Sequence, residues 1–278
     1  FVDITSPYIP TPITNSPTNN NTPTWNWSAI SDAVSYEVTL NNVIQQIQTE
    51  TSFTPSALFE GANEIRIRAK DSVGNYSNYG THVVFIDLTS PESPVPNTES
   101  PTSNNRPNWT WSSISDAIEY EVLLNGDLIS SQTISVFTCN DALDDGTHEL
   151  KVRAKDNVGN YSDYGISTIV VDTNSPNIPQ PSTSTPTSDN TPTWTWSAIQ
   201  DAVEYEVKLN GIVQLTQTST SFTSSTLSSG THQIHVRAKD NVGNYSEYGS
   251  HIVNVDTNSP FIPNPTSITP TNNNTPTW

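Results

Sequence analysis

The sequence predicts an all-β protein made of three tandem antiparallel β-sandwich modules, with partial modules at both ends. Three observations lead to this prediction. A tryptophan-rich phrase recurs at a constant spacing, short segments alternate apolar with polar residues, and asparagine, glycine and proline separate those segments. The chain has 21 prolines, 11 glycines and abundant Thr, Asn and Ser in 278 residues, a composition that disfavours helices.

The recurring phrase is "NNNTPTWNWS" at 19–28, and it returns at 104–112, 189–197 and 272–278. Its first tryptophans are spaced by 84, 85 and 84 residues, and so are four aspartates: Trp25, Trp109, Trp194, Trp278; Asp3, Asp87, Asp172, Asp256. Two landmarks with one domain-sized period predict a tandem array. We expect modules at 7–88, 89–173 and 174–257. Residues 1–6 are expected to end a preceding module, and residues 258–278 to hold a linker and the first strand of a following one.

Each module contains segments with a period of two, as in strands that are buried on one face. In the third module, "EYEVKL" places Tyr205, Val207 and Leu209 on one face and charged residues on the other. "HQIHVRAKD" and "SHIVNVD" alternate in the same way, and the paired tryptophans lie two residues apart. About seven such strands, separated by frequent turn residues, predict a β-sandwich.

Two turns have recognisable chemistry. "NN" at 41–42 and "NG" at 125–126 and 210–211 suit the positive φ of a tight hairpin. "DSVGNYS" and two copies of "DNVGNYS" join the last two strands of each module. In these turns we expect the glycine to be left-handed and the aspartate side chain to close an Asx-type turn; the residues are Gly74, Gly159, Gly243 and Asp71, Asp156, Asp240.

A tryptophan strand, then Y-E-V-x-L-N-G, then G-T-H-x-x-x-V-R-A-K-D-x-V-G-N-Y-S and a strand ending V-D-T-N-S-P resembles bacterial immunoglobulin-like repeats. More narrowly, it is similar to the fibronectin type III-like repeats of large surface adhesins, over nearly the whole chain. Such modules usually have a tyrosine six residues before the alanine of the "V-x-A" strand. Asn63, His148 and His232 stand there, so we expect the tyrosine corner to be absent or rebuilt.

The resemblance implies an extracellular, array-forming structural role at a cell surface, as a stalk, spacer or biofilm adhesin. The formal net charge of −18 disfavours nucleic acid and anionic lipid and favours divalent cations. The sequence has no apolar stretch of 18 residues, so we expect no membrane insertion of this segment. The expected partners are neighbouring modules of the same chain and, in a fibre, other copies. The surface ligand is unknown.

Calcium is the one cofactor that the sequence suggests. Asp87, Asp172 and Asp256 end the last strand of each module, where adhesin arrays similar to this one bind calcium between neighbours. The alternative is that each aspartate caps its strand end or forms a hydrogen bond with the Thr two residues on. Asp71, Asp156 and Asp240 are weaker candidates, because turn geometry already explains them.

Other candidates have structural explanations. Tryptophans two apart favour core packing over sugar binding, whereas we expect Tyr76, Tyr161 and Tyr245 to be exposed. Cys139 is the only cysteine, and we interpret it as an incidental thiol. None of the five histidines occupies a position shared by all three modules, and no catalytic motif is present, so we expect no enzyme activity. Sequons occur at Asn20, Asn26, Asn75, Asn108, Asn160, Asn244 and Asn273.

Outward charges and proline-rich connections complete the sequence-based picture. We expect three cross-strand pairs on the sheet surface: Glu37–Arg68, Glu121–Arg153 and Glu206–Arg237. The linkers at 89–96, 173–181 and 257–265 contain spaced prolines and no glycine, which favours extended, stiff backbone. We therefore expect an elongated rod of about 120 Å, at about 40 Å per sandwich. Two other hypotheses remain: a filament subunit in which "NNNTPTW" adds a strand to the next copy, and a carbohydrate-binding accessory module.

Overall fold

The computed structural model describes residues 2–264 of the chain, and every regular element in that range is a β-strand. The chain divides into two compact units. The first holds the chain up to Ser100, Arg106–Leu143 and Thr147–Val170, and the second holds Pro101–Asn105, Asp144–Gly146 and the chain from Val171. The strands form three repeats of one six-strand pattern, here named the first, second and third repeat. The sequence "NNNTPTW" at 272–278, used in the strand-addition hypothesis, and the sequon at Asn273 lie outside the described residues.

The strands of the three repeats occupy equivalent positions. The first repeat contains β1 (Trp25–Asn26), β2 (Ala33–Leu40), β3 (Val43–Gln48), β4 (Ser52–Phe53), β5 (Gly61–Asp71) and β6 (Gly80–Ile86). The second contains β7 (Asn108–Thr110), β8 (Glu119–Leu124), β9 (Asp127–Gln132), β10 (Val136–Thr138), β11 (Gly146–Lys155) and β12 (Gly165–Val171). The third contains β13 (Thr193–Thr195), β14 (Glu204–Leu209), β15 (Ile212–Gln217), β16 (Ser221–Thr223), β17 (Gly230–Lys239) and β18 (Gly249–Val255).

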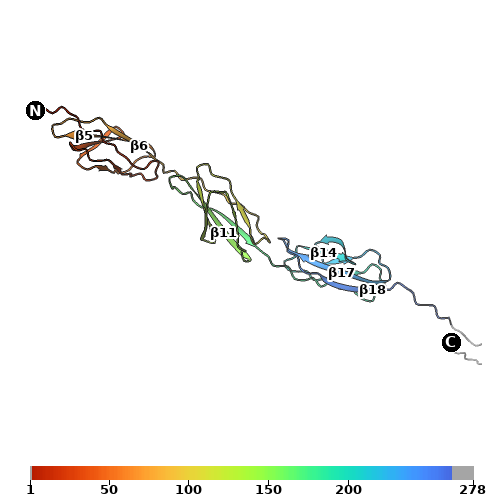
Figure 1. Cartoon of the computed structure of the whole chain (residues 1–278). Helices are drawn as coiled ribbons and strands as arrows, with labels where there is room; N and C mark the ends of the chain where they lie inside the picture. Colours follow the sequence, from red (N-terminus) through yellow and green to blue (C-terminus); the bar gives the residue numbers. More distant parts are fainter. Residues whose placement is uncertain (1, 265–278) are drawn as a thin grey trace, which may run out of the picture. The chain divides into compact units, whose positions relative to one another are not determined.

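Each repeat consists of two antiparallel layers. Four strands form the larger layer in the order β3-β2-β5-β6 in the first repeat, β9-β8-β11-β12 in the second and β15-β14-β17-β18 in the third. In Figure 1, β14, β17 and β18 run side by side in the larger layer of the third repeat. The smaller layer is the pair β1-β4, β7-β10 or β13-β16. These antiparallel layers confirm the predicted all-β sandwich.

The segment that precedes each first strand completes the two layers. In the first repeat Ile13 bridges Asn26 of β1 in an antiparallel sense, and Thr18 bridges Ile86 of β6 in a parallel sense. The same chain segment therefore lines both layers, and it supplies the seventh strand-like piece that the sequence predicted. It also covers the backbone edge of β6, which would otherwise be free to pair with another chain.

The core lies between the layers and has the parity that the sequence predicted. In the first repeat Trp25, Val38, Ile65 and Ile67 are fully buried, and Trp27 packs edge-on against Tyr36. The other two repeats have equivalent cores, with Trp109, Trp111, Trp194 and Trp196 at most 6% exposed. The tryptophans within the described residues are thus core residues, and they offer no exposed face on which a sugar ring could stack.

The first turn of the larger layer confirms the predicted hairpin chemistry. Asn41 and Asn42 have φ values of 48° and 67°, and Asn125 and Asn210 have 53° and 52°. Positive φ at both central positions gives the turn a twist that matches the strands it connects. The edge strand after each hairpin contains a bulge at an equivalent place. In the first repeat the bulge of β3 lies opposite Val38 and Thr39 of β2. A bulge makes a free edge a poor template for pairing.

Candidate functional site

The most regular polar feature of the chain is the glycine turn that follows β5, β11 and β17. In the second repeat Asp156 is 4% exposed, and its Oδ1 accepts hydrogen bonds from the backbone N–H groups of Val158, Gly159 and Asn160, at 2.9, 2.7 and 2.8 Å. Gly159 has a φ of 99°, which a residue with a side chain rarely adopts. Asp71 and Asp240 make the same three bonds, so the predicted Asx-type turn is confirmed in all three repeats.

These bonds stabilise the ionised form of the aspartate. Burial raises the pKa of Asp156, but the backbone and side-chain hydrogen bonds from Asn160, Val158 and Gly159 outweigh it and hold the pKa below its usual value. The pKa of Asp71 is lowered for the same reasons. A carboxylate that already accepts four hydrogen bonds is a poor metal ligand, because its lone pairs are in use.

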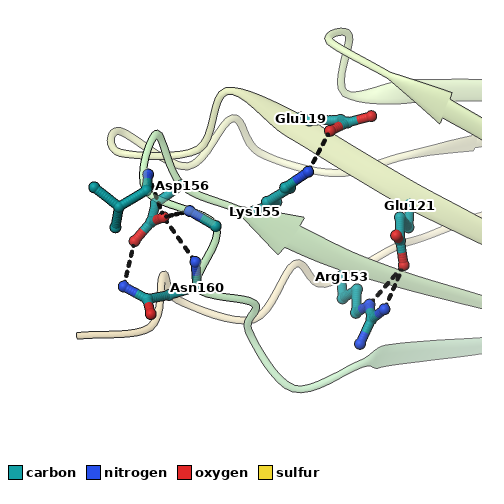
Figure 2. Close-up of polar contacts among 8 residues, drawn as sticks. Glu119, Glu121, Arg153, Lys155, Asp156 and Asn160 are labelled. Carbon is teal, nitrogen blue, oxygen red and sulfur yellow. Dashed lines mark hydrogen bonds and ion pairs between the residues drawn. The ribbon is translucent and has the colours of Figure 1, made fainter. Parts of the chain in front are cut away.

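The asparagine of the turn connects it to the segment that enters the repeat. Asn160 Nδ2 donates to Asp156 Oδ2 at 2.8 Å, and to the backbone oxygens of Asp87 and Thr89 at 3.0 and 3.2 Å. Figure 2 shows the amide of Asn160 directed at the Asp156 carboxylate. An amide nitrogen has two hydrogens, so one is used by the carboxylate and the other is shared by the two carbonyls.

This asparagine clamp is present in every repeat. Asn75 Nδ2 donates to the oxygens of Asp3 and Thr5, both at 3.2 Å, and Asn244 Nδ2 donates to those of Asp172 and Asn174, at 2.9 and 3.1 Å. The clamp uses the nitrogen to which a glycan would be attached. The N-Y-S sequons therefore have an acceptor nitrogen that already binds the chain.

The aspartates at the junctions form a different local structure. Asp87 Oδ1 accepts the N–H of Thr89 at 3.1 Å, and the N–H of Asp87 donates to the oxygen of Thr18 at 3.0 Å. Asp172 and Asp256 repeat both contacts, with Asn174 and Asn258 as the N–H donors to their carboxylates. The hydrogen bond from the Thr two residues on, the alternative expected from the sequence, is present at Asp87; at Asp172 and Asp256 an asparagine donates in place of the threonine.

Calcium at the junctions remains a prediction. Within residues 2–264, no group of three or more His, Cys, Asp and Glu side chains is placed to hold a metal ion. Calcium requires six to eight oxygen ligands, and each junction aspartate already uses one carboxylate oxygen in its Asx turn. A bound ion would need further oxygens from the backbone or from water.

The outer face of each larger layer carries the predicted cross-strand ion pairs. Glu37 lies opposite Arg68 in the ladder, and Arg68 Nε and Nη2 donate to its two carboxylate oxygens at 2.9 and 2.8 Å. Figure 2 shows the equivalent Glu121–Arg153 pair together with Glu119–Lys155. The third pair joins Arg237 Nη2 to Glu206 at 3.0 Å.

These pairs are less exposed than the sequence predicted, because tyrosines from the glycine turn cover them. Glu37 is only 5% exposed, and Tyr79 donates its hydroxyl hydrogen to Glu37 Oε1 at 2.6 Å. The guanidinium of Arg68 lies 4.1 Å from the ring centroid of Tyr76. Hydrogen bonds from Arg68 lower the pKa of Glu37 and outweigh the effect of its burial, with a further contribution from Tyr79.

The expectation that the first tyrosine of the turn is exposed was therefore wrong for two repeats. Tyr76 and Tyr161 are half-buried, and Tyr245 is 38% exposed. Each ring stacks on the arginine of the ion pair, at 4.1, 4.0 and 3.9 Å in the three repeats. Attraction between a cation and an aromatic face compensates for partial burial.

The tyrosine corner is rebuilt with other polar side chains. Asn63 is buried, and its Nδ2 donates to the backbone oxygens of Phe59 and Gly61 at 2.9 and 3.1 Å. In the third repeat His232 Nε2 bonds the oxygen of Ser228 at 2.9 Å, and its Nδ1 bonds Asn210. Both side chains reach the backbone four residues upstream, which is the bond that a corner tyrosine would supply.

The comparisons with known proteins agree with this architecture. A family model described as a bacterial Ig-like domain matches residues 86–173 and 180–257, more than half of the chain. The chain belongs to the bacterial Ig-like domain family. Domains of this kind are typically non-catalytic, and no catalytic activity is shown for these Ig-like repeats.

A curated relative of this Ig-like chain is Exoglucanase B of Cellulomonas fimi, which is 27% identical over 287 residues. The match covers 93% of this chain and 26% of the relative, so the chain spans about a quarter of that protein's length.

Solved structures similar to the chain include the fibronectin(III)-like modules of Clostridium thermocellum CbhA, with a TM-score of 0.37 and 18% identity over 58% of this chain and 94% of that chain. A structure of a 1.5-MDa bacterial ice-binding adhesin has a TM-score of 0.42 and 16% identity over 88% of this chain and 99% of that chain. At these TM-scores the likenesses add no argument of their own.

Three further observations concern expectations from the sequence. Cys139 is buried, its Sγ contacts the oxygen of Asp141 at 3.2 Å, and burial raises the pKa of its thiol, so it has the low reactivity of a core cysteine. Within residues 2–264 there is no helix long and apolar enough to cross a membrane. Sequence reasoning missed the clamp by Asn75, Asn160 and Asn244. The only signal in the sequence is an asparagine after every turn glycine, which by itself indicates a sequon.

Proposed function

We propose that these Ig-like repeats are an extracellular structural spacer of a surface or secreted protein. In this role the chain supplies length and separation, and other parts of the full-length protein supply binding or catalysis. The observation that supports this most directly is the recurrence of one complete sandwich at a period of 84–85 residues, each with its own closed core.

Several properties of the surface suit a spacer. The net charge of −18 keeps such repeats soluble and apart from anionic surfaces. The bulged edge strands and the segment that covers β6 protect the sheets from pairing with other chains. The outer charges of the larger layers are largely paired with one another, so they do not form a single recognition site.

Two settings suit this role. The sequence motifs resemble those of surface-adhesin repeats, and the curated relative is named an exoglucanase. A module array between functional domains is useful in either kind of protein. In both settings we place the chain outside the cell.

Small-angle X-ray scattering on the chain tests the proposal. A compact globule of this length has a radius of gyration of about 19 Å. A rod of about 120 Å, from three sandwiches of about 40 Å each, has one of about 35 Å. Deletion of one repeat, residues 89–173, is expected to shorten the maximum dimension by about one third, because each sandwich contributes about 40 Å. A radius of gyration close to the compact value would contradict the spacer function.

Two other functions are separated from this one by simple measurements. A self-assembling filament subunit requires association, so a monomer by light scattering at micromolar concentration rejects it. A carbohydrate-binding module requires an exposed platform, and the tryptophans of the described residues are buried. Binding of any glycan on an array, abolished by substitution of an exposed tyrosine such as Tyr245, would favour that alternative.

A further inference from the structure

The residues that connect consecutive repeats are held by side chains from both sides. We propose that the connection between the first and second repeats, which lies within the first compact unit, is a locked joint rather than a free hinge. Three side chains lock it: the junction aspartate Asp87, the turn asparagine Asn160 of the following repeat and Glu60, directly before the first glycine of β5. This proposal rests on the spacer function and adds the means by which the spacer resists bending.

The following repeat holds the joint through its asparagine clamp. Asn160 donates to the oxygens of Asp87 and Thr89, which are residues i and i+2 of the connection. Two carbonyls of an extended chain that are two residues apart do not normally converge on one donor. Here they converge because Asp87 Oδ1 accepts the N–H of Thr89 and bends the connection into an Asx turn. The junction aspartate thus shapes the chain that the asparagine binds.

The preceding repeat holds the same residues through the loop before its long strand. In the first unit the hydroxyl of Thr89 donates to Glu60 Oε1. In the second unit Asp145 Oδ1 accepts the N–H and the hydroxyl of Thr173, both at 2.8 Å, and Asp145 Oδ2 accepts from Asn174 Nδ2. Ser229 makes the equivalent bonds to Thr257, at 2.8 and 3.0 Å.

The three holding residues occupy one structural position. Glu60, Asp145 and Ser229 each stand directly before a glycine with positive φ, at 97°, 136° and 142°. The glycine turns the chain sharply at the start of the strand, and this directs the preceding side chain toward the connection. The position differs in chemistry among the repeats, yet it supplies a hydrogen-bond acceptor every time.

The lock has a plain consequence for dynamics. Prolines make the connection stiff along its own length, but stiff segments still pivot at their ends. Residues 87–89 lie at such an end. The backbone oxygens of Asp87 and Thr89 accept from Asn160 of the following repeat, while the Asp87 N–H and the Thr89 hydroxyl donate to Thr18 and Glu60 of the preceding one. Removing the lock frees about three residues, and a flexible segment of that length has an end-to-end spread of roughly 9 Å.

Pulsed dipolar EPR on the full chain tests the joint. Cys139→Ser removes the native thiol, and the third repeat has Ser224 at the equivalent position. Spin labels are then placed at Thr81→Cys and Ile166→Cys, two exposed positions on β6 and β12. We expect a narrow distance distribution in this background. We expect Asp87→Ala and Asn160→Ala each to broaden it by several ångströms.

Matched variants separate the lock from general damage. Asp87→Asn keeps an oxygen that can accept the Thr89 N–H, so it is expected to retain the narrow distribution. Asn157→Ala, in the same glycine turn, removes an exposed amide and is also expected to leave it unchanged. Asp87→Ala leaves the Asn160–Asp156 bond in place, so its effect does not depend on the stability of the turn. Circular dichroism of every variant verifies that the repeats are folded.

The outcomes decide between the proposals. A broad distribution in the parent, or equal widths in the parent and both alanine variants, overturns the joint. If scattering nevertheless gives the radius of gyration of a long particle, the spacer function stands without a locked joint. A compact particle overturns the spacer function itself.

Discussion

The carboxylate of Asp156 is the best place to perturb a single repeat, because the second repeat contains its own reporter. Asp156→Asn retains the size of the side chain and removes its charge. Oδ1 accepts three backbone N–H groups at 2.7–2.9 Å, and Oδ2 accepts the amide of Asn160 at 2.8 Å. The substitution weakens the first three bonds and places a donor opposite the donor of Asn160.

The magnitude follows from these four contacts. A hydrogen bond to a charged group contributes about 1.5–3 kcal/mol and a neutral one about 0.5–1.5 kcal/mol, so each weakened bond costs roughly 1–1.5 kcal/mol. Three weakened bonds lead to an expected loss of at least about 3 kcal/mol in the free energy of unfolding, and the donor–donor contact adds to this loss. With an m-value of about 1–3 kcal/mol/M in urea, the urea midpoint falls by about 1–3 M.

The assay uses Cys139, the only cysteine of the chain, which is 5% exposed in the folded second repeat. Thiol labelling as a function of urea reports the unfolding of that repeat alone. Asp163→Asn is the matched control, because it removes one exposed charge from the same loop. We expect labelling at lower urea for Asp156→Asn and an unchanged curve for Asp163→Asn. Equal midpoints for the two variants would refute the assigned role of the Asp156 carboxylate.

The pH dependence of stability, measured for the parent and for Asp156→Asn, tests the direction of this charge effect. The pKa of Asp156 is lower in the folded protein than its usual value of about 3.9. The contribution of its charge is therefore fully present above that value and is lost as the pH falls through the lowered pKa of the folded state. We expect the parent and Asp156→Asn to differ most near neutral pH and to converge in acid. A gap that widens on acidification would contradict this reasoning.

Three other predictions use other parts of the repeats. Gly165→Ala is expected to destabilise the second repeat by about 3 kcal/mol or more, because the new methyl group would lie 1.7 Å from the backbone oxygen of Pro94. If Cys139 of this variant became labelled at the same urea concentration as in the parent, the result would argue against this close approach. Glu37→Gln is expected to lower the free energy of unfolding of the first repeat by about 1–2 kcal/mol, because Arg68 loses a nearly buried charged partner. Calorimetry measures this change, and an unchanged melting temperature would show that the ion pair does not contribute to stability. If calcium binds at the junctions, the melting temperature is higher with calcium than with EDTA, and superimposable curves at physiological ionic strength would reject calcium binding.

Some features of the site were accessible from the sequence because they depend on neighbours in the chain. The Asx-type turn at Asp156 needs only an aspartate and a glycine three residues on, and the hairpins need only asparagine or glycine where φ is positive. The pairs Glu37–Arg68 and Glu206–Arg237 followed from strand parity once adjacent strands were assumed. Periodicity therefore predicted these contacts correctly.

Other features were not accessible, because their partners are distant in sequence and have no side-chain signature. Asn160 binds carbonyl oxygens of residues 71 and 73 positions earlier, and every residue has a carbonyl. Glu37 was expected to be exposed, but its burial depends on where Tyr79 falls after a turn 42 residues away. The corner bond of Asn63 was likewise hidden, since only the fold brings its amide to Phe59.

By itself, the sequence determined the repeat period, the two-layer parity and the turn chemistry of this protein, because each depends on residue order over a few positions or on exact recurrence. Only the tertiary structure decided which carboxylates are covered, where the tyrosines stack and that the connections between repeats are bonded on both sides. The covered carboxylates and the bonded connections depend on side chains and main-chain oxygens that are brought together across about 30–70 residues, and no local pattern specifies them.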